Sequence, residues 1–216
     1  MSTLISTVKA YINFALGLRG FLDDKITLEY AKSTIAHQVA HREENFLRTL
    51  KTNVFEYPRS PYLALFKWAN ITYRDVEQLV AKQGLESTLE ELFEAGVYVE
   101  FEEVKGRKPI IRDGLELHPS ASDFDTPNIK PVMLRHTAGS TGAPTRTKFD
   151  FEHMRQKTLL QVITYHMFDC LKIPTATWNG PLPLTGGFEN IIRLNTMGLS
   201  LERWFTPIIG RQANLS

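Results

Sequence analysis

The residues best suited to chemistry in this chain form one short run, Thr137-Ala138-Gly139-Ser140-Thr141-Gly142-Ala143-Pro144-Thr145-Arg146. Its two glycines allow the backbone to adopt positive φ and to come close to an anion. Its hydroxyl side chains donate hydrogen bonds, and successive backbone N–H groups can converge on one anion. The run therefore indicates a loop that holds phosphate, and the alternative is an ordinary surface turn.

Other well-known loops do not fit this run. A P-loop requires GxxxxGK followed by Ser or Thr, whereas Gly142 comes three residues after Gly139 and precedes Ala143. The dinucleotide fingerprint GxGxxG and the hydrolase elbow GxSxG are also absent around Gly139. A kinase-type, Rossmann-type or α/β-hydrolase site is therefore excluded at this position.

The run resembles the signature Thr-Ser/Ala-Gly-Ser/Thr-Thr-Gly-x-Pro of the adenylate-forming superfamily, whose members activate carboxylates as acyl-AMP. The matching residues are Thr137, Ala138, Gly139, Ser140, Thr141, Gly142 and Pro144. Many members carry lysine at the position of Thr145, whereas the phenylacetate-CoA-ligase-like branch commonly carries threonine or another residue there. Arg146 is the alternative source of a positive charge. Flanking segments at residues 60–62, 92–99 and 123–127 are similar to the same branch.

The resemblance implies that the loop holds the β- and γ-phosphates of ATP while a substrate carboxylate attacks the α-phosphate. Mg²⁺ is implied for the intact family enzyme, and coenzyme A is a possible acceptor thiol. Thr137, Ser140, Thr141 and Thr145 are the expected phosphate ligands. The full set of candidate cofactor-binding residues is His136, Thr137, Ala138, Gly139, Ser140, Thr141, Gly142, Thr145 and Arg146.

Several residues have an alternative role that is purely structural. His136 and Arg135 end a strand, where side chains alternate, so only one of the two is expected to face the loop. Trp178, Phe188 and Trp204 could line an acyl pocket, but core packing is the stronger interpretation. His37 and His41 have helical i,i+4 spacing without an evident third ligand, and no metal site is expected.

The later motifs of the superfamily are missing from this sequence. No aspartate follows Asp169, no lysine follows Lys172, and Thr185-Gly186-Gly187-Phe188-Glu189 matches the aromatic-Gly-x-Thr-Glu element poorly. We therefore expect this chain to be the amino-terminal portion of an AMP-forming acyl- or aryl-CoA ligase and to be inactive alone. The sequence identifies neither its catalytic residues nor its carboxylate substrate. A complementary chain that supplies the missing half, or self-association, is a possible partner. The alternative is a non-catalytic interaction module or partner subunit that retains the phosphate-loop scaffold.

Composition narrows the class of protein further. The chain is 43% hydrophobic and 23% charged with a net charge of +1, which gives no global field for nucleic acid or an anionic membrane. Cys170 is the single cysteine, so no internal disulfide forms, and it is expected in a helix core. No signal peptide or membrane span is expected, and a cytoplasmic protein is predicted.

The first hundred residues are predicted to be mostly helical. Apolar residues with helical spacing predict a helix over residues 4–22 and a second one from a Thr27 cap to just before Pro58. Ser60-Pro61 opens a third helix, and a fourth begins at Thr72 or Asp75. Ser87-Thr88-Leu89-Glu90 is predicted to be the capping box of a fifth.

Strands are predicted in the middle of the chain. Residues 97–101 and 109–112 suggest a hairpin around Lys105-Gly106-Arg107, with Glu100, Glu102 and Glu103 on a solvated edge. Residues 116–130 suggest a loop, and residues 131–135 and 147–149 suggest strands on either side of the glycine run. Asp150 is then expected to cap the strongest helix, which ends at Pro174; residues 175–187 suggest a loop and 191–209 a partly helical segment.

These elements predict an α/β fold in which a helical amino-terminal region precedes a small mixed sheet with flanking helices. The resemblance identifies it as an incomplete large domain of an adenylate-forming enzyme. The expected division is 1–58 as the helical region and 59–216 as the part carrying the phosphate loop, with one continuous domain 1–216 as the alternative.

Overall fold

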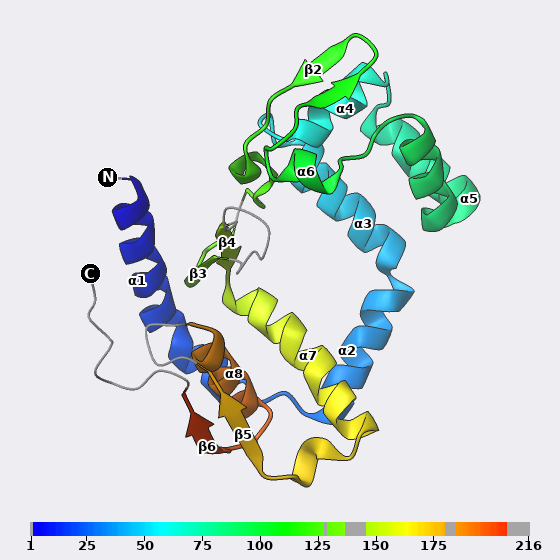
Figure 1. Ribbon diagram of the computed structural model, residues 1–216. Helices are drawn as coiled ribbons and strands as arrows, with labels where there is room; N and C mark the ends of the chain where they lie inside the picture. Colours follow the sequence, from blue (N-terminus) through cyan, green and yellow to red (C-terminus); the bar gives the residue numbers. More distant parts are fainter. Residues whose placement is uncertain (1, 128, 137–145, 180–184, 207–216) are drawn as a thin grey trace. The chain divides into compact units, whose positions relative to one another are not determined.

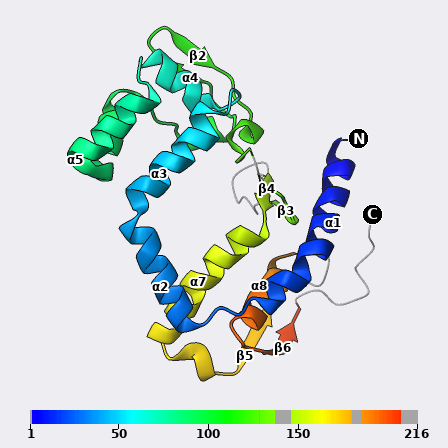
Figure 2. The same ribbon diagram turned by 180° about the vertical axis from the view of Figure 1, so that it is seen from behind.

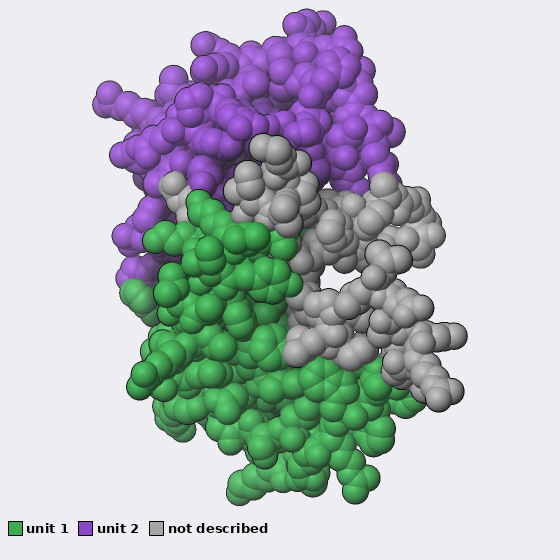
Figure 3. Space-filling model, turned by 90° about the vertical axis from the view of Figure 1, so that its left-hand side faces the viewer, with its two compact units in different colours: residues 1–37, 130–216 green, residues 38–129 purple. Residues whose placement is uncertain are grey.

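The computed structural model describes residues 2–127, 129–136, 146–179 and 185–206 (Figure 1). The chain is mixed α/β and mostly helical, with small sheets. It divides into two compact units, the first formed by residues 1–37 and 130–216 and the second by residues 38–129 (Figure 3). The expected boundary at residue 58 therefore falls inside the second unit.

The first unit is built on α1 (Ser2–Asp23), α7 (Phe151–Met167) and α8 (Thr185–Thr196). Helices α1 and α8 lie side by side in both views of the ribbon (Figures 1 and 2). The predicted helix over residues 4–22 is thus confirmed. One face of α1 packs Phe14, Leu18 and Phe21 into an apolar cluster with Met154 of α7 and Ile192 of α8.

The second predicted helix begins as expected but does not run unbroken. The Thr27 hydroxyl accepts a hydrogen bond from the Tyr30 N–H (3.1 Å) and α2 spans Leu28–Ala40. The chain then breaks at His41 (φ −108°, ψ 24°), where the side-chain amide of Asn45 donates to the Gln38 carbonyl (3.4 Å). Helix α3 (Arg42–Leu50) follows, and it continues into a π-helical turn, η1 (Lys51–Phe55).

The second unit continues with α4 (Pro61–Trp68) and α5 (Tyr73–Glu94). The predicted helix start at Thr72 is confirmed: Thr72 and Asp75 form a capping box, and the hydrogen bonds from Thr72 lower the pKa of the Asp75 carboxyl. Pro61 takes the first helical position, as predicted.

The predicted helix start at Ser87 is wrong. Helix α5 is kinked at Gly84 (φ 81°, ψ 173°), and its second part begins at Leu85, whose N–H donates to Glu43 Oε1 (3.2 Å). A carboxylate from α3 therefore supplies the cap, and Ser87 lies within the helix. Positive φ at this kink favours glycine.

The predicted hairpin is displaced along the chain. Residues 97–100 form no strand, because the Glu103 carboxylate accepts the Glu100 N–H (2.6 Å) and begins a short helix, α6 (Phe101–Val104). Strands β1 (Ile110–Arg112) and β2 (Leu115–Leu117) pair antiparallel around Gly114 (φ 71°). A 3₁₀ turn, η2 (Ala121–Phe124), follows inside the expected loop.

The expectation of a solvated acidic edge is also wrong for Glu103. Its side chain is 5% exposed and pairs with Arg112 (3.3 Å). The Arg112 guanidinium also donates to the carbonyls of Gly96 (3.0 Å) and Tyr98 (2.7 Å). This arginine therefore ties the segment after α5 to strand β1.

The last part of the chain differs most from the sequence expectation. Helix α7 ends at Met167, before Asp169 (φ 54°), and Cys170 lies in a half-exposed 3₁₀ turn, η3 (Cys170–Lys172), outside any helix core. Strands β5 (Thr175–Trp178) and β6 (Leu201–Phe205) pair in parallel, with α8 as the connection between them. This β-α-β unit replaces the predicted loop and the long partly helical segment.

The sheets do not merge into one. The described residues form three separate two-stranded sheets, of which β5–β6 is the parallel one. The single small mixed sheet of the sequence prediction is therefore not found among them. No helix of the described residues is long and apolar enough to cross a membrane.

Candidate functional site

The predicted phosphate loop closes a β-hairpin. Strand β3 (Met133–His136) pairs antiparallel with β4 (Arg146–Phe149), and the register runs from Met133 opposite Phe149 to His136 opposite Arg146. The predicted strands on either side of the glycine run are therefore confirmed. The two ends of the loop are held next to each other by the last pair of the ladder.

The loop itself lies outside the described residues. This applies to Thr137, Ala138, Gly139, Ser140, Thr141, Gly142 and Thr145. For Arg135, His136 and Arg146 the structure describes the backbone alone, so their predicted contacts with phosphate stay predictions.

The far end of the hairpin is anchored in the core of the first unit. The Val132 N–H donates to the Phe149 carbonyl (2.7 Å), which extends the pairing beyond β3. Val132 and Met133 are buried against Phe21 of α1 and Met154 of α7. Apolar packing therefore fixes the base of the hairpin.

Helix α7 begins directly after β4. Asp150 has extended backbone geometry (φ −118°, ψ 178°) and its carboxylate accepts the His153 N–H (2.8 Å), which confirms the predicted cap. The next residue, Phe151, stacks its ring on Phe21 (5.0 Å between centroids) and on Phe14 (5.8 Å). The turn from strand to helix is thus fixed by a hydrogen bond and by aromatic packing against α1.

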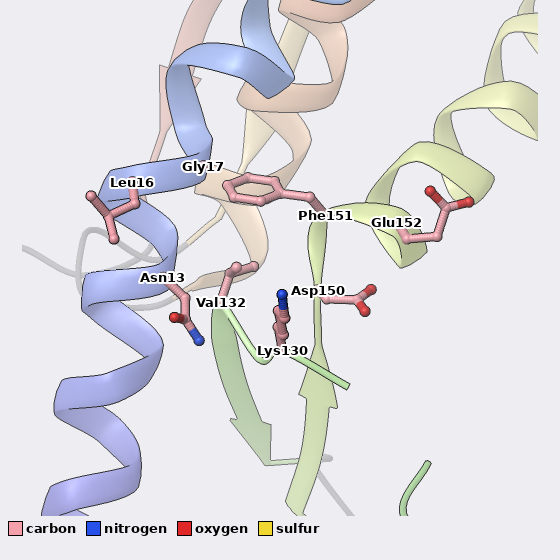
Figure 4. Close-up of a pocket in the computed structure, with 8 residues that line it drawn as sticks. All are labelled: Asn13, Leu16, Gly17, Lys130, Val132, Asp150, Phe151 and Glu152. Carbon is pink, nitrogen blue, oxygen red and sulfur yellow. The ribbon is translucent and has the colours of Figure 1, made fainter. Parts of the chain in front are cut away.

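A cavity of about 390 Å³ opens beside the base of the hairpin (Figure 4). Its apolar lining comes from Leu16, Val132 and Phe151, and Gly17 leaves room for the ring. The polar lining residues are Asn13, Lys130, Asp150 and Glu152. Figure 4 shows the Asn13 side chain between α1 and the hairpin and the Lys130 side chain between Val132 and Asp150, whereas the Glu152 carboxylate points away from them.

Most polar groups of this cavity already have partners. The Asn13 amide donates to the Pro131 carbonyl (3.1 Å), Asp150 caps α7, and Glu152 accepts from Gln156 (2.7 Å). The cavity lies at the Val132–Asp150 end of the hairpin, and three residues of extended strand lie between Val132 and His136, a span of about 13 Å. The lining residues of the cavity therefore include none of the residues predicted to bind phosphate.

A buried charge cluster joins α7 to α8. The Glu189 side chain lies between Lys157 Nζ (2.8 Å) and Arg193 Nε (3.3 Å), and the residue is 2% exposed. Glu189 belongs to the segment that matched the aromatic-Gly-x-Thr-Glu element poorly, and its partners here are cations of the protein. Sequence reasoning missed this cluster, because its three residues come from two helices that meet only in the fold.

The three aromatic residues weighed for an acyl pocket do not meet in one place. Phe188 packs into the apolar cluster beside Phe14 (5.7 Å between ring centroids). The Trp204 indole donates to the Asn179 carbonyl (2.9 Å), and Trp178 is exposed and stacks on Phe205. The described residues thus support the packing interpretation for Phe188.

Among the described residues, no group of three or more His, Cys, Asp or Glu side chains could hold a metal ion. His37 lies on α2 and His41 at the break after it, so the two do not share a helix. Comparison of the chain with models of protein families, with curated proteins and with solved structures found no match. The assignment to the adenylate-forming superfamily therefore depends on the signature and its setting.

Proposed function

We propose that this chain is the amino-terminal portion of an AMP-forming ligase, in which residues 137–145 hold the β- and γ-phosphates of ATP. The observation that carries the proposal is the β3–β4 hairpin, whose register places His136 opposite Arg146 and so holds both ends of the signature run. A rigid base under a glycine-rich loop lets several N–H groups face one anion without further ordering.

The residues of the loop have distinct roles in this proposal. The backbone N–H groups and the hydroxyls of Thr137, Ser140, Thr141 and Thr145 donate to phosphate oxygens, and Gly139 and Gly142 let the backbone come close. Arg146 supplies a positive charge at the end of the loop, where the lysine of many superfamily members is replaced by Thr145. Mg²⁺ and coenzyme A belong to the intact enzyme, and the later adenylation motifs are absent from this sequence.

Calorimetric titration of the full chain with ATP and with pyrophosphate tests this proposal. Gly142→Val is expected to abolish the binding heat, because a branched side chain disfavours positive φ and blocks the anion. Thr141→Ala is expected to weaken binding about tenfold, the usual effect of one lost hydrogen bond to a charged group.

Thr49→Ala is the matched control, since it removes an exposed threonine from α3 and should leave the heats unchanged. Thermal melting of each variant separates lost binding from lost folding. Equal heats for the wild type and Gly142→Val would remove the phosphate-loop assignment.

A second candidate function is that of an interaction module. It is favoured by the large apolar side chains that α1 and α5 leave exposed among the described residues. Binding of ATP and association with another chain do not exclude each other.

A further inference from the structure

Helix α1 presents an apolar stripe on the face that does not pack into the first unit. Val8, Ile12 and Leu16 follow one another at i, i+4 and i+8, and each is at least half exposed, with Leu16 80% exposed. The opposite face holds the helix in place through Phe14, Leu18 and Phe21. Such spacing of anchors is typical of a helix that lies in an apolar groove.

The second unit contains a groove of matching character. Its cavity of about 390 Å³ is walled by Phe46, Leu50 and Val54 from α3 and η1, and by Leu89 and Phe93 from α5. Phe93 is 60% exposed and its ring lies 4.6 Å from that of Tyr98, which also lines the groove. Arg112 lies over the Tyr98 ring (4.2 Å) and fixes this wall.

The charges around the stripe and the groove are opposite. Helix α1 contains Lys9 and Arg19, and Asp23 in its last turn pairs with Arg19 (3.8 Å). Residues 83–104, which form one wall of the groove, contain seven glutamates, of which Glu86, Glu102 and Glu103 pair with Arg42, Arg107 and Arg112. Glu90 and Glu94 lie beside Leu89 and Phe93 on the exposed face of α5. Opposite charge around apolar anchors favours association and sets its orientation.

We infer that two copies of this chain associate by placing the α1 stripe of one copy in the α5 groove of the other. The partner is a second copy because the stripe and the groove, with complementary charge, occur on the same chain. Leu16 and Ile12 are the anchors, and Lys9 faces the glutamates beside Leu89 and Phe93 in the groove of the other copy. The inference does not depend on phosphate binding.

A complementation experiment on the full chain tests this interface. Light scattering during gel filtration is expected to give the wild type a mass of at least twice 24.7 kDa. Leu16→Glu places a carboxylate against the glutamates of the other copy's groove. Phe93→Glu replaces an aromatic residue that lines the groove with a charged one. Each variant alone is expected to weaken association at least about tenfold.

A mixture of the two variants is the decisive sample. The intact stripe of Phe93→Glu meets the intact groove of Leu16→Glu, so one contact is restored and complexes of two chains are expected. Leu160→Glu, at an exposed position of α7, is the matched control and should associate as the wild type does. Circular dichroism confirms that each variant is folded.

Several results would overturn the inference. A wild type that stays monomeric at every concentration excludes the contact. If Leu16→Glu disrupts association while Phe93→Glu has no effect, α1 binds something other than this groove. A mixture that stays monomeric while both variants are folded also contradicts it.

Discussion

Glu189 is a single residue whose charge the fold needs. Its carboxylate is buried between Lys157 and Arg193 and joins α7 to α8. Glu189→Gln keeps the size of the side chain but leaves the two cations without their shared counter-charge. We expect a loss of about 2 kcal/mol or more in the free energy of unfolding, measured by urea denaturation.

Glu152→Gln provides the comparison for this prediction. Glu152 is exposed on the first turn of α7, and its ion pair with Arg155 is long (3.9 Å). Its replacement is expected to change stability by less than about 0.5 kcal/mol. Equal losses for the two variants would show that the buried cluster has no special role.

The residues that start helices were largely readable from the sequence. Thr27, Thr72 and Asp150 each accept a backbone N–H three residues ahead, so the signal is contained in a few adjacent residues. Glu43 could not be found in this way, because it caps Leu85 across 42 positions of the chain. Local patterns predict a cap only when the cap comes from the same turn.

At the scale of elements, α1 packs against α7 at Gly17, a residue without a side chain. A Cβ atom built on Gly17 would overlap the ring of Phe151, which stacks between Phe14 and Phe21, whereas one on Gly20 meets nothing within 4 Å. Gly17→Ala is expected to destabilise the protein by about 1 to 3 kcal/mol, because the ring would have to shift out of its stack on Phe14 and Phe21.

Gly20→Ala in the same helix gives the opposite expectation. With open space around it, alanine should stabilise α1 by about 0.5 to 1 kcal/mol through its higher helix propensity. Thermal or chemical unfolding of both variants checks this difference in sign. Two stabilised variants would mean that Phe151 does not pack on Gly17.

The strands show what local patterns miss. The pairing of β3 with β4 was predicted because apolar and β-branched residues flank a glycine-rich turn. The parallel pair β5–β6 was missed, since Thr175-Ala176-Thr177-Trp178 is short and its partner follows only after α8. The sequence pattern that predicts such a unit is a strand, a helix and a second strand in succession.

At the scale of the whole molecule, the chain divides into two compact units whose bounds differ from the division at residue 58 expected from the sequence. The first unit joins residues 1–37 to 130–216, and only contacts between distant segments reveal this. The hairpin setting of the signature run was predictable, whereas the cavity beside its base was not, because α1, β3 and α7 meet there through tertiary packing. The sequence thus located the candidate loop but not its surroundings.

The central claim is that residues 137–145 bind phosphate, and amide NMR of the full chain tests it most directly. We expect ATP with Mg²⁺ to shift the backbone amide signals of Ser140, Thr141 and Gly142 together with those of His136 and Arg146 at the end of the hairpin. Amides of β1 and β2 in the second unit serve as the internal reference and should not move. Saturating ATP that leaves the signals of residues 136–146 unchanged, or that shifts signals only elsewhere, would contradict the account.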